Sequence, residues 1–503
     1  MSAFAEGLNA LLDPTVAVCL LVGLLIGTLV GMFPGVTGSM AVALAAGFTL
    51  TLEPVQGLAV LLTIYVGANY GDRIPAILVN TPGTPAAIAT TLDGYPLAKQ
   101  GKGGLALVSS AMVTTGGILL SVVVFIFAAR PVASIALEFG PAEMFALVVF
   151  GLTVMISISS RSLLKGLLAG IAGLAIATIG RDPITGDERF VFGLNDLNSG
   201  LPFIAVIIGL FGIAELFDQL LTHHPGTAQI VSSLGRWWPT RAEYKQMARP
   251  FALSSVLGTV VGAVPAAGGD IAGLIGWDRA KRMSKHPEKF GKGSLEGLTA
   301  ADTASSATLG GSLTTTMALG VPGDSVMAVM LGSMLIWGLQ PGPSMFVQSP
   351  ELVASIAGIM IIATVLSLGI SLVRSQGMVK ILDLPRHYIW VGILLFCIVG
   401  TYTTSNNMYT VWVMLLSGVV GVIMKRTGFP PGPVVLGLLL GPLAESNLRR
   451  ALLIDGPASL VTQPIAASLL LLAAFSLAMP LIRRARAARR DGAPPQPIEV
   501  DRT

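Results

Sequence analysis

Long apolar stretches dominate the chain, and short polar or Pro/Gly-rich segments separate them. Gly104–Ala129 and Leu352–Val373 carry no charge and exceed the ~20 residues that an α-helix needs to cross a bilayer. Leu469–Ile482 reaches that length with its uncharged upstream flank. Similar spans are predicted at Thr15–Phe33, Val55–Tyr70, Met144–Ser160, Leu163–Ile179, Leu201–Leu216, Tyr388–Thr401 and Val411–Met424. The pattern predicts an all-α polytopic membrane protein with about 10–12 transmembrane helices.

The composition agrees with this pattern and excludes other classes. Hydrophobic residues make up 53% of the chain and charged residues only 12%, whereas a soluble domain carries about 25% charged residues. Cys19 and Cys397 lie far apart inside apolar spans, and none of the four histidines has HExxH spacing. We therefore expect no metal centre, no cofactor and no enzymatic activity. The expected surroundings are a lipid bilayer and not a nucleic acid.

Two halves of the chain carry the same pattern of helix breakers. Gly27–Ser39 reads GTLVGMFPGVTGS, and Gly258–Asp270 reads GTVVGAVPAAGGD at a shift of 231 positions. NTPGT at Asn80–Thr84 has its counterpart in GVPGD at Gly320–Asp324, at a shift of 240 positions. The sequence predicts two related repeats, each with Pro-Gly-broken helices or re-entrant hairpins. Matching interruptions of this kind are the best sequence indication of a transport site in a membrane protein.

The loop charges predict that the two repeats have inverted topology. Arg279–Lys292 holds six Lys/Arg residues, whereas its counterpart Phe48–Gln56 holds none. Downstream the bias is reversed, because Asp93–Gly103 contains two lysines and Ser333–Ser344 is uncharged. Short loops rich in Lys/Arg stay in the cytoplasm. We therefore expect Arg279–Lys292 and the arginine-rich tail at Arg483–Arg490 to be cytoplasmic, and leave the side of the N-terminus open.

This interpretation divides the chain into four parts. Residues 1–221 form the first transmembrane repeat and residues 251–490 the second. Residues 222–250, which contain paired tryptophans beside basic residues, are expected to be an interfacial connector, with a solvated linker as the alternative. Residues 491–503 are Pro-rich and polar, and we expect them to be disordered.

The breaks are candidates for binding an anion. Proline ends a helix, and the following glycines permit backbone geometry that other residues resist. A new helix that begins near Ser39 presents free N–H groups, and such groups attract carboxylates or phosphates. A single Pro-Gly is more often a packing kink, but four breaks that match between repeats favour a binding site. The candidate substrate-binding residues are Gly35, Thr37, Gly38, Ser39, Asn80, Thr81, Gly83, Thr84, Gly268, Gly269, Gly323 and Ser325.

Acidic and polar residues in apolar surroundings are candidates for ion coupling. Acids at membrane depth are functional by default, and two polar runs, Asn69–Arg73 and Asp302–Ser306, stand out from the apolar sequence around them. Carboxylate and carbonyl oxygens suit Na⁺, and a lone buried acid suits H⁺, so both ions stay open. The candidate ion-coupling residues are Asn69, Asp270, Ser305, Ser306 and Asp324. A membrane-embedded enzyme or an anion channel is the alternative class, although no nucleophile–base pair is visible.

Several of these motifs resemble the large membrane subunit of the tripartite tricarboxylate transporter family. The matching stretches run from residue 27 to residue 452 and include NTPG…DGYP and LGVPGD…GLQPGP. The resemblance implies a secondary transporter of carboxylates in a bacterial inner membrane, with a small four-span membrane subunit and a periplasmic substrate-binding protein. The chain departs from the family pattern at Ala300–Ala307 and Pro265–Gly268. These departures change the hydrogen-bonding groups near the breaks and leave the identity of the carboxylate open.

Overall fold

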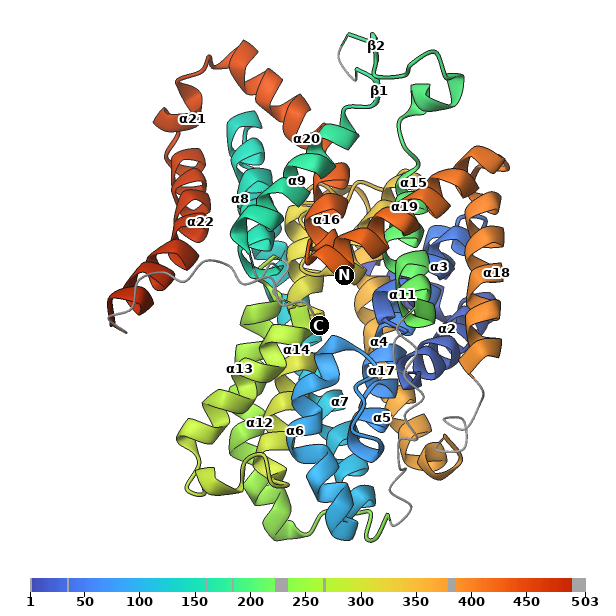
Figure 1. Ribbon diagram of the computed structural model, residues 1–503, viewed down its shortest axis with the longest axis vertical. Coiled ribbons are helices and arrows are strands. Elements are labelled where there is room, and N and C mark those ends of the chain that lie inside the picture. Colours follow the sequence, from blue (N-terminus) through green and yellow to red (C-terminus); the bar gives the residue numbers. More distant parts are fainter. Residues whose placement is uncertain are drawn as a thin grey trace. The chain divides into compact units, whose positions relative to one another are not determined.

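The computed structural model describes residues 2–33, 36–159, 162–182, 185–221, 234–265, 268–378 and 386–490. In this part of the chain, turns and loops join helices, and the strands are the short antiparallel pair β1 (Gly180–Arg181) and β2 (Glu188–Arg189), as Figure 1 shows. Five of the described helices are long and apolar enough to cross a membrane, and several shorter helices are also apolar. The prediction of an all-α polytopic membrane protein is therefore confirmed. The inverted orientation of the repeats stays a prediction.

Each predicted apolar span coincides closely with a helix or a continuous helical run, and the structure has further helices outside these spans. The first half contains α1 (Ser2–Asn9), α2 (Pro14–Met32), α3 (Gly38–Thr49), α4 (Pro54–Gly71), α5 (Arg73–Leu78), the 3₁₀ turn η2 (Pro85–Ala87), α6 (Ile88–Leu97), the π-helical segment η3 (Ala98–Lys102), α7 (Gly103–Ala136), α8 (Pro141–Ser159), α9 (Leu163–Ala177), α10 (Phe203–Ile207), the π-helical segment η5 (Ile208–Ile213) and α11 (Ala214–Leu221). The second half contains α12 (Arg241–Gly262), α13 (Gly268–Met283), the 3₁₀ turn η6 (Pro287–Lys289), α14 (Leu295–Leu319), α15 (Ser325–Ile336), α16 (Met345–Gln348), α17 (Pro350–Met378), α18 (Arg386–Ser405), α19 (Met408–Thr427), α20 (Pro431–Ile454), α21 (Ser459–Thr462) and α22 (Pro464–Arg490).

The first helix break of each half lies where the sequence predicts it. In the first half α2 ends at Met32 and α3 begins at Gly38. Thr37 caps α3, because its Oγ1 accepts a hydrogen bond from the backbone N–H of Met40 at 3.2 Å. In the second half α12 ends and α13 begins six residues later, after Pro265.

The second break of each half is also present. α5 ends at Leu78, and the chain becomes helical again at η2 and α6. α14 ends with Gly320 in the left-handed conformation, at a φ of 70°, which glycine adopts without strain. α15 then begins with Asp324 as its N-cap, whose Oδ1 accepts from the N–H of Met327 at 2.8 Å.

Small residues bring the same helices together in both halves. A Cβ added at Gly27 of α2 would lie 2.3 Å from the carbonyl oxygen of Ile64 on α4. A Cβ added at Gly258 of α12 would lie 2.2 Å from the carbonyl oxygen of Ala304 on α14. The close approach repeats one turn later in both helix pairs. These glycines therefore serve helix packing, and Ile64 and Ala304 are themselves related by the shift of 240 positions.

The described helices form two compact units. The first unit contains α1–α7 and α10–α19, and its core includes the buried Ile77, Leu97 and Leu298. The second unit contains α8, α9 and α20–α22. Within the second unit α9 packs closely on α20, because a Cβ at Gly173 would lie 2.2 Å from the carbonyl oxygen of Val434.

The connector and the tail are described only in part. Residues 222–233 of the expected connector and residues 491–503 of the expected tail lie outside the described residues. α12 begins at Arg241 behind a capping box of Thr240 and Glu243, and Arg236 donates to Glu243 at 2.7 Å. α12 then continues without interruption to Gly262. The expected boundary at residue 250 therefore lies inside a helix.

Candidate functional site

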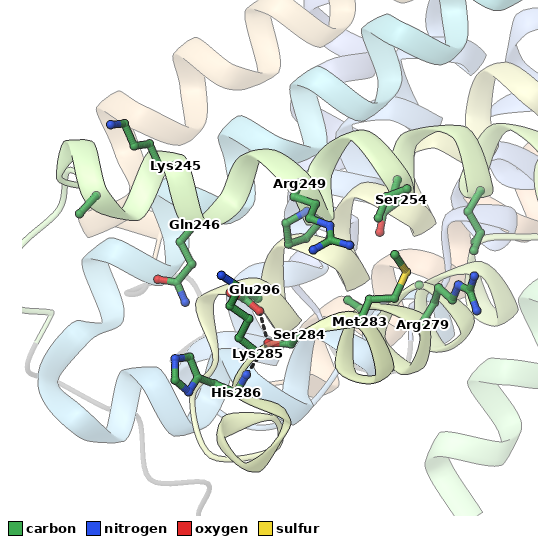
Figure 2. Close-up of a pocket in the computed structure, with 16 residues that line it drawn as sticks. Lys245, Gln246, Arg249, Ser254, Arg279, Met283, Ser284, Lys285, His286 and Glu296 are labelled. Atoms are coloured by element: carbon green, nitrogen blue, oxygen red, sulfur yellow. Dashed lines mark hydrogen bonds between the residues drawn. The ribbon is translucent and has the colours of Figure 1, made fainter.

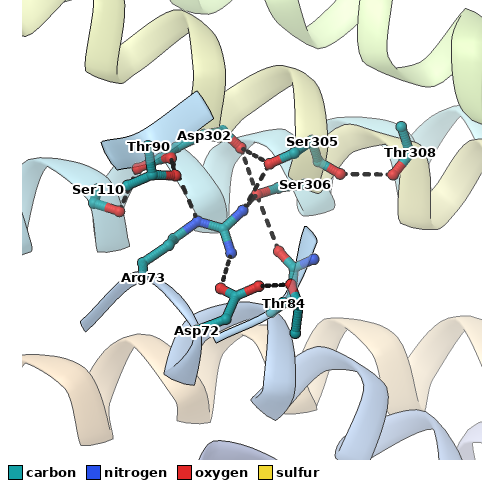
Figure 3. A network of polar contacts seen from close by, with 10 residues as sticks. Asp72, Arg73, Thr84, Thr90, Ser110, Asp302, Ser305, Ser306 and Thr308 are labelled. Atoms are coloured by element: carbon teal, nitrogen blue, oxygen red, sulfur yellow. Dashed lines mark hydrogen bonds and ion pairs between the residues drawn. The ribbon is translucent and has the colours of Figure 1, made fainter. Parts of the chain in front are cut away.

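A charged network is buried in the first unit, where the junction of α4 and α5 meets α14 (Figure 3). Arg73 is the first residue of α5, and only 2% of its surface is exposed. Its Nη1 lies 2.8 Å from Asp72 Oδ1, and its Nε lies 3.7 Å from Asp302 Oδ1. Asp302 comes from the middle of α14, so the network joins residues from both halves of the chain.

Three of the predicted ion-coupling residues surround Arg73. Its Nη2 donates to Ser305 Oγ at 2.9 Å and to Ser306 Oγ at 2.8 Å. Ser306 Oγ also lies 3.2 Å from Asn69 Oδ1. All three residues are buried, so the structure brings together Asn69, Ser305 and Ser306 as one polar site inside the helix bundle.

Hydroxyl groups hold the two carboxylates in place. Thr84 Oγ1 donates to Asp72 Oδ2 at 2.5 Å, and Thr90 Oγ1 donates to Asp302 Oδ1 at 2.5 Å. The hydroxyl of Ser110 donates to the other oxygen of Asp302. Thr84 belongs to the second break of the first half, so that break is tied directly to the buried network.

The network carries an excess of negative charge when both carboxylates are ionised. Asp72 and Asp302 are 1% and 0% exposed, and a single guanidinium lies between them. An uncompensated buried charge is expensive in a low-dielectric interior. A bound cation, or a proton on one carboxylate, removes that excess. A cavity of about 20 Å³ beside Tyr70, Arg73 and Ser110 is large enough for roughly one water molecule.

A second polar cluster forms around Asp324. The hydroxyl of Tyr65 on α4 donates to one oxygen of Asp324, and the other oxygen caps α15. A Cβ at Gly268 would lie 3.9 Å from Asp324 Cβ, so the start of α13 adjoins this carboxylate. Asp270 lies in the first turn of the same helix. The helix start that carries Asp270 therefore adjoins Asp324 at the second break of this half.

The predicted substrate-binding residues of the first break lie at the start of α3. The hydroxyls of Thr37 and Ser39 are 3.1 Å apart, and Gly38 is the first helical residue. Gly35 lies outside the described residues. The assignment of these residues to substrate binding stays a prediction.

The residues of the second breaks have largely local or packing contacts. Asn80 has a φ of 57°, and the N–H of Thr81 donates to the carbonyl oxygen of Pro75 at 3.2 Å, so both residues close the end of α5. A Cβ at Gly83 would lie 2.0 Å from the carbonyl oxygen of Gly31. These contacts show that Asn80, Thr81 and Gly83 contribute to turn geometry and helix packing.

The corresponding residues of the second half show the same arrangement. A Cβ at Gly323 would lie 2.6 Å from the Cβ of Ser312. In the first half, a Cβ at Gly83 would lie similarly close, 3.0 Å from the Cβ of Asp72. Ser325 is the first residue of α15. Gly269 brings the start of α13 against η2, since its Cβ would lie 3.3 Å from the Cβ of Ala86. The breaks of the two halves thus adjoin each other.

Sequence reasoning missed the central residues of the Arg73 network and the tyrosine partner of Asp324. Asp72, Arg73 and Asp302 lie inside the two polar runs that stood out, and charged residues within apolar spans were the available signal. That signal does not identify partners in the fold. Tyr65 gave no signal, because an aromatic residue in an apolar helix is ordinary.

Broken helices that meet around buried charges define a polytopic membrane protein of the transport class. The profile of the tripartite tricarboxylate transporter TctA family matches residues 17–436, and the chain belongs to this family. It is a family of transporters and not of enzymes, and its name implies further subunits.

Two similar proteins come from Agrobacterium vitis. The 52.8 kDa protein of the TAR-I ttuC′ 3′ region is 35% identical over 491 residues, which cover 97% of this chain and 98% of that protein. A protein of the TAR-II ttuC′ 3′ region is 34% identical over 234 residues, which cover 46% of this chain and 97% of that protein. No solved structure matches the chain significantly.

Proposed function

We propose that this chain is the permease subunit of a binding-protein-dependent secondary transporter that takes up an organic di- or tricarboxylate. An ion gradient drives the uptake, and the protein resides in a bacterial inner membrane with its C-terminus in the cytoplasm. The observation that carries this proposal is the buried network of Asp72, Arg73 and Asp302, which contacts a helix break through Thr84. Family membership supports the class of transporter and of substrate.

Cation binding to this network accounts for ion coupling. Na⁺ at the carboxylate and hydroxyl oxygens, or a proton on a carboxylate, removes the excess negative charge. Asp72 accepts from Thr84 at 2.5 Å, so a cation on Asp72 competes with the bond that holds the break. Ion occupancy therefore changes the relative energies of the break's conformations, which is the requirement for coupling.

The carboxylate substrate is expected at the helix starts of the breaks and not at Arg73. The charge of Arg73 is already offset by two acids. The start of α3 presents N–H groups beside the hydroxyls of Thr37 and Ser39. One such helix start stabilises a bound anion by about 0.3–1 kcal/mol.

Acids near the breaks make anion binding depend on the cation. Asp270 lies in the first turn of α13 and would repel a carboxylate bound there. A cation or proton that neutralises Asp270 or Asp324 removes this repulsion, so ion and substrate bind with positive cooperativity. The coupling is reciprocal, because the bound carboxylate raises the affinity for the cation by the same factor.

The test is uptake by proteoliposomes that contain this chain, the small four-span subunit and the periplasmic binding protein. A panel of radiolabelled di- and tricarboxylates and a neutral sugar is offered under a Na⁺ gradient, a pH gradient or no gradient. The proposal expects accumulation of a carboxylate only with the binding protein and one of the gradients. Equal uptake without any gradient would indicate a channel, and sugar uptake would contradict the substrate class.

A further inference from the structure

A second charged region of the first unit lies away from the breaks, between α12 and α13. A cavity of about 410 Å³ is bounded there by the two helices, by the segment before η6 and by the start of α14 (Figure 2). Its lining includes Lys245 and Arg249 from α12, Arg279 from α13, and Lys285 from the segment before η6. We call this cavity the basic cleft.

The basic side chains of the cleft outnumber its acidic side chains. Among the described residues, none of its four Lys/Arg side chains makes an ion pair. Its one carboxylate, Glu296, accepts a hydrogen bond from Ser284 Oγ at 2.5 Å. By contrast, Arg282 lies outside the cleft lining and pairs with Asp278 at 2.8 Å. The cleft therefore favours a ligand with more than one negative charge or with a charged phosphate.

The basic cleft also has apolar side chains in its walls. Leu253, Leu257 and Met283 line it, and the face of α12 continues with Val256 and Val260, which are 67% and 61% exposed. From Lys245 to Val260 the helix rises by roughly 22 Å. A row of exposed aliphatic side chains beside a cluster of cations fits a molecule with an anionic head and hydrocarbon chains.

We propose that the basic cleft binds an anionic phospholipid, with the phosphate at Arg249 and Lys285 and the acyl chains along α12. Basic pockets between transmembrane helices bind anionic headgroups on the side of the membrane where Lys/Arg-rich loops lie. A soluble polycarboxylate would satisfy the charges but would leave the apolar wall unused. The lipid also links α12 to α13. Arg279, which lines the cleft, lies about 14 Å from Asp270 along α13.

The experiment measures lipid binding to the purified, delipidated protein in detergent. Native mass spectrometry compares phosphatidylglycerol with phosphatidylcholine for the wild type and for the double variant Arg249→Gln/Lys285→Gln. Each basic residue near an anionic lipid contributes a factor of about five, so the double variant should bind phosphatidylglycerol roughly thirtyfold more weakly. Arg282→Gln is the matched control, because it removes a positive charge of α13 outside the cleft, and it should bind as the wild type does.

Three results would overturn the proposal. The wild type could bind both lipids equally. The double variant could also keep its affinity for phosphatidylglycerol, with size-exclusion chromatography showing that it is folded. Millimolar inorganic phosphate or tricarboxylate could also displace the lipid fully, which would assign the cleft to a soluble anion. If the double variant does not fold, Arg249→Gln and Lys285→Gln each provide the test, with an expected loss of about fivefold.

Discussion

Replacing Arg73 by glutamine tests the description of the buried network. The side chain is 3% exposed and contacts Asp72, Asp302, Ser305 and Ser306. Arg73→Gln removes the positive charge and leaves two buried carboxylates without a cation. Their hydroxyl partners stay, but hydroxyls do not neutralise charge.

The expected loss follows from the burial of the network. Removing one partner of a buried ion pair costs about 3–5 kcal/mol, because the remaining charge is uncompensated. A loss of this size lowers the melting temperature by roughly 4–6 °C for a unit as large as the first one. Arg73→Lys keeps the charge, but a single ammonium cannot contact Asp72, Ser305 and Ser306 together as the forked guanidinium does. The loss of stability in Arg73→Lys should therefore be intermediate. Adding Asp72→Asn to Arg73→Gln should restore part of the stability, because it removes one unpaired charge.

The assay is the melting temperature in detergent, read from the monodisperse fraction after heating. Arg282→Gln is the control, since its pair with Asp278 is largely exposed, at 72% and 53%, and is worth about 0–1 kcal/mol. If Arg73→Gln melts within about 2 °C of the wild type, the buried ion pair does not hold the fold together and the reasoning is wrong. If Asp72→Asn worsens the effect of Arg73→Gln, the charge argument is also wrong.

Three further predictions concern the breaks and the topology. Gly83→Val should abolish folding, because a Cβ there would lie 2.0 Å from a backbone carbonyl oxygen of α2. Gly369→Val is the control and should fold, because the space around its Cβ is open, and size-exclusion chromatography compares the two variants. Asp324→Asn and Tyr65→Phe should slow gradient-driven uptake in proteoliposomes while the protein stays in the membrane, and normal uptake by both would contradict the role of this cluster. In a cysteine-free background, Lys285→Cys should react with an impermeant maleimide only after the inner membrane is permeabilised, and labelling in intact cells would contradict the inverted topology.

The helix breaks could be predicted because they depend on local chemistry. Proline removes a backbone donor and glycine tolerates left-handed geometry, whatever the surroundings. The expected helix start near Ser39 is therefore found one residue earlier, at Gly38. The glycine spacing of α2 and α12 likewise indicated close packing, and the structure shows backbone contacts at both places.

The partners of the buried charges could not be predicted in the same way. Arg73 and Ser305 are 232 residues apart, and their contact depends on how α5 and α14 pack. The sequence argument selected Asp270 and Asp324 because they follow breaks, and it passed over Asp302 inside an unbroken helix. The rule that intramembrane charges are functional does identify Asp302, but only the fold shows that Arg73 lies between it and Asp72.

The central claim is that a cation at the Asp72–Arg73–Asp302 network drives carboxylate uptake. Its most direct test compares ion-driven accumulation with substrate exchange in proteoliposomes of the wild type and of Asp72→Asn, which keeps the shape of the side chain. The account predicts that Asp72→Asn exchanges internal for external carboxylate but no longer accumulates it under a Na⁺ or pH gradient. Accumulation by Asp72→Asn at the wild-type level and with the same ion dependence would contradict it.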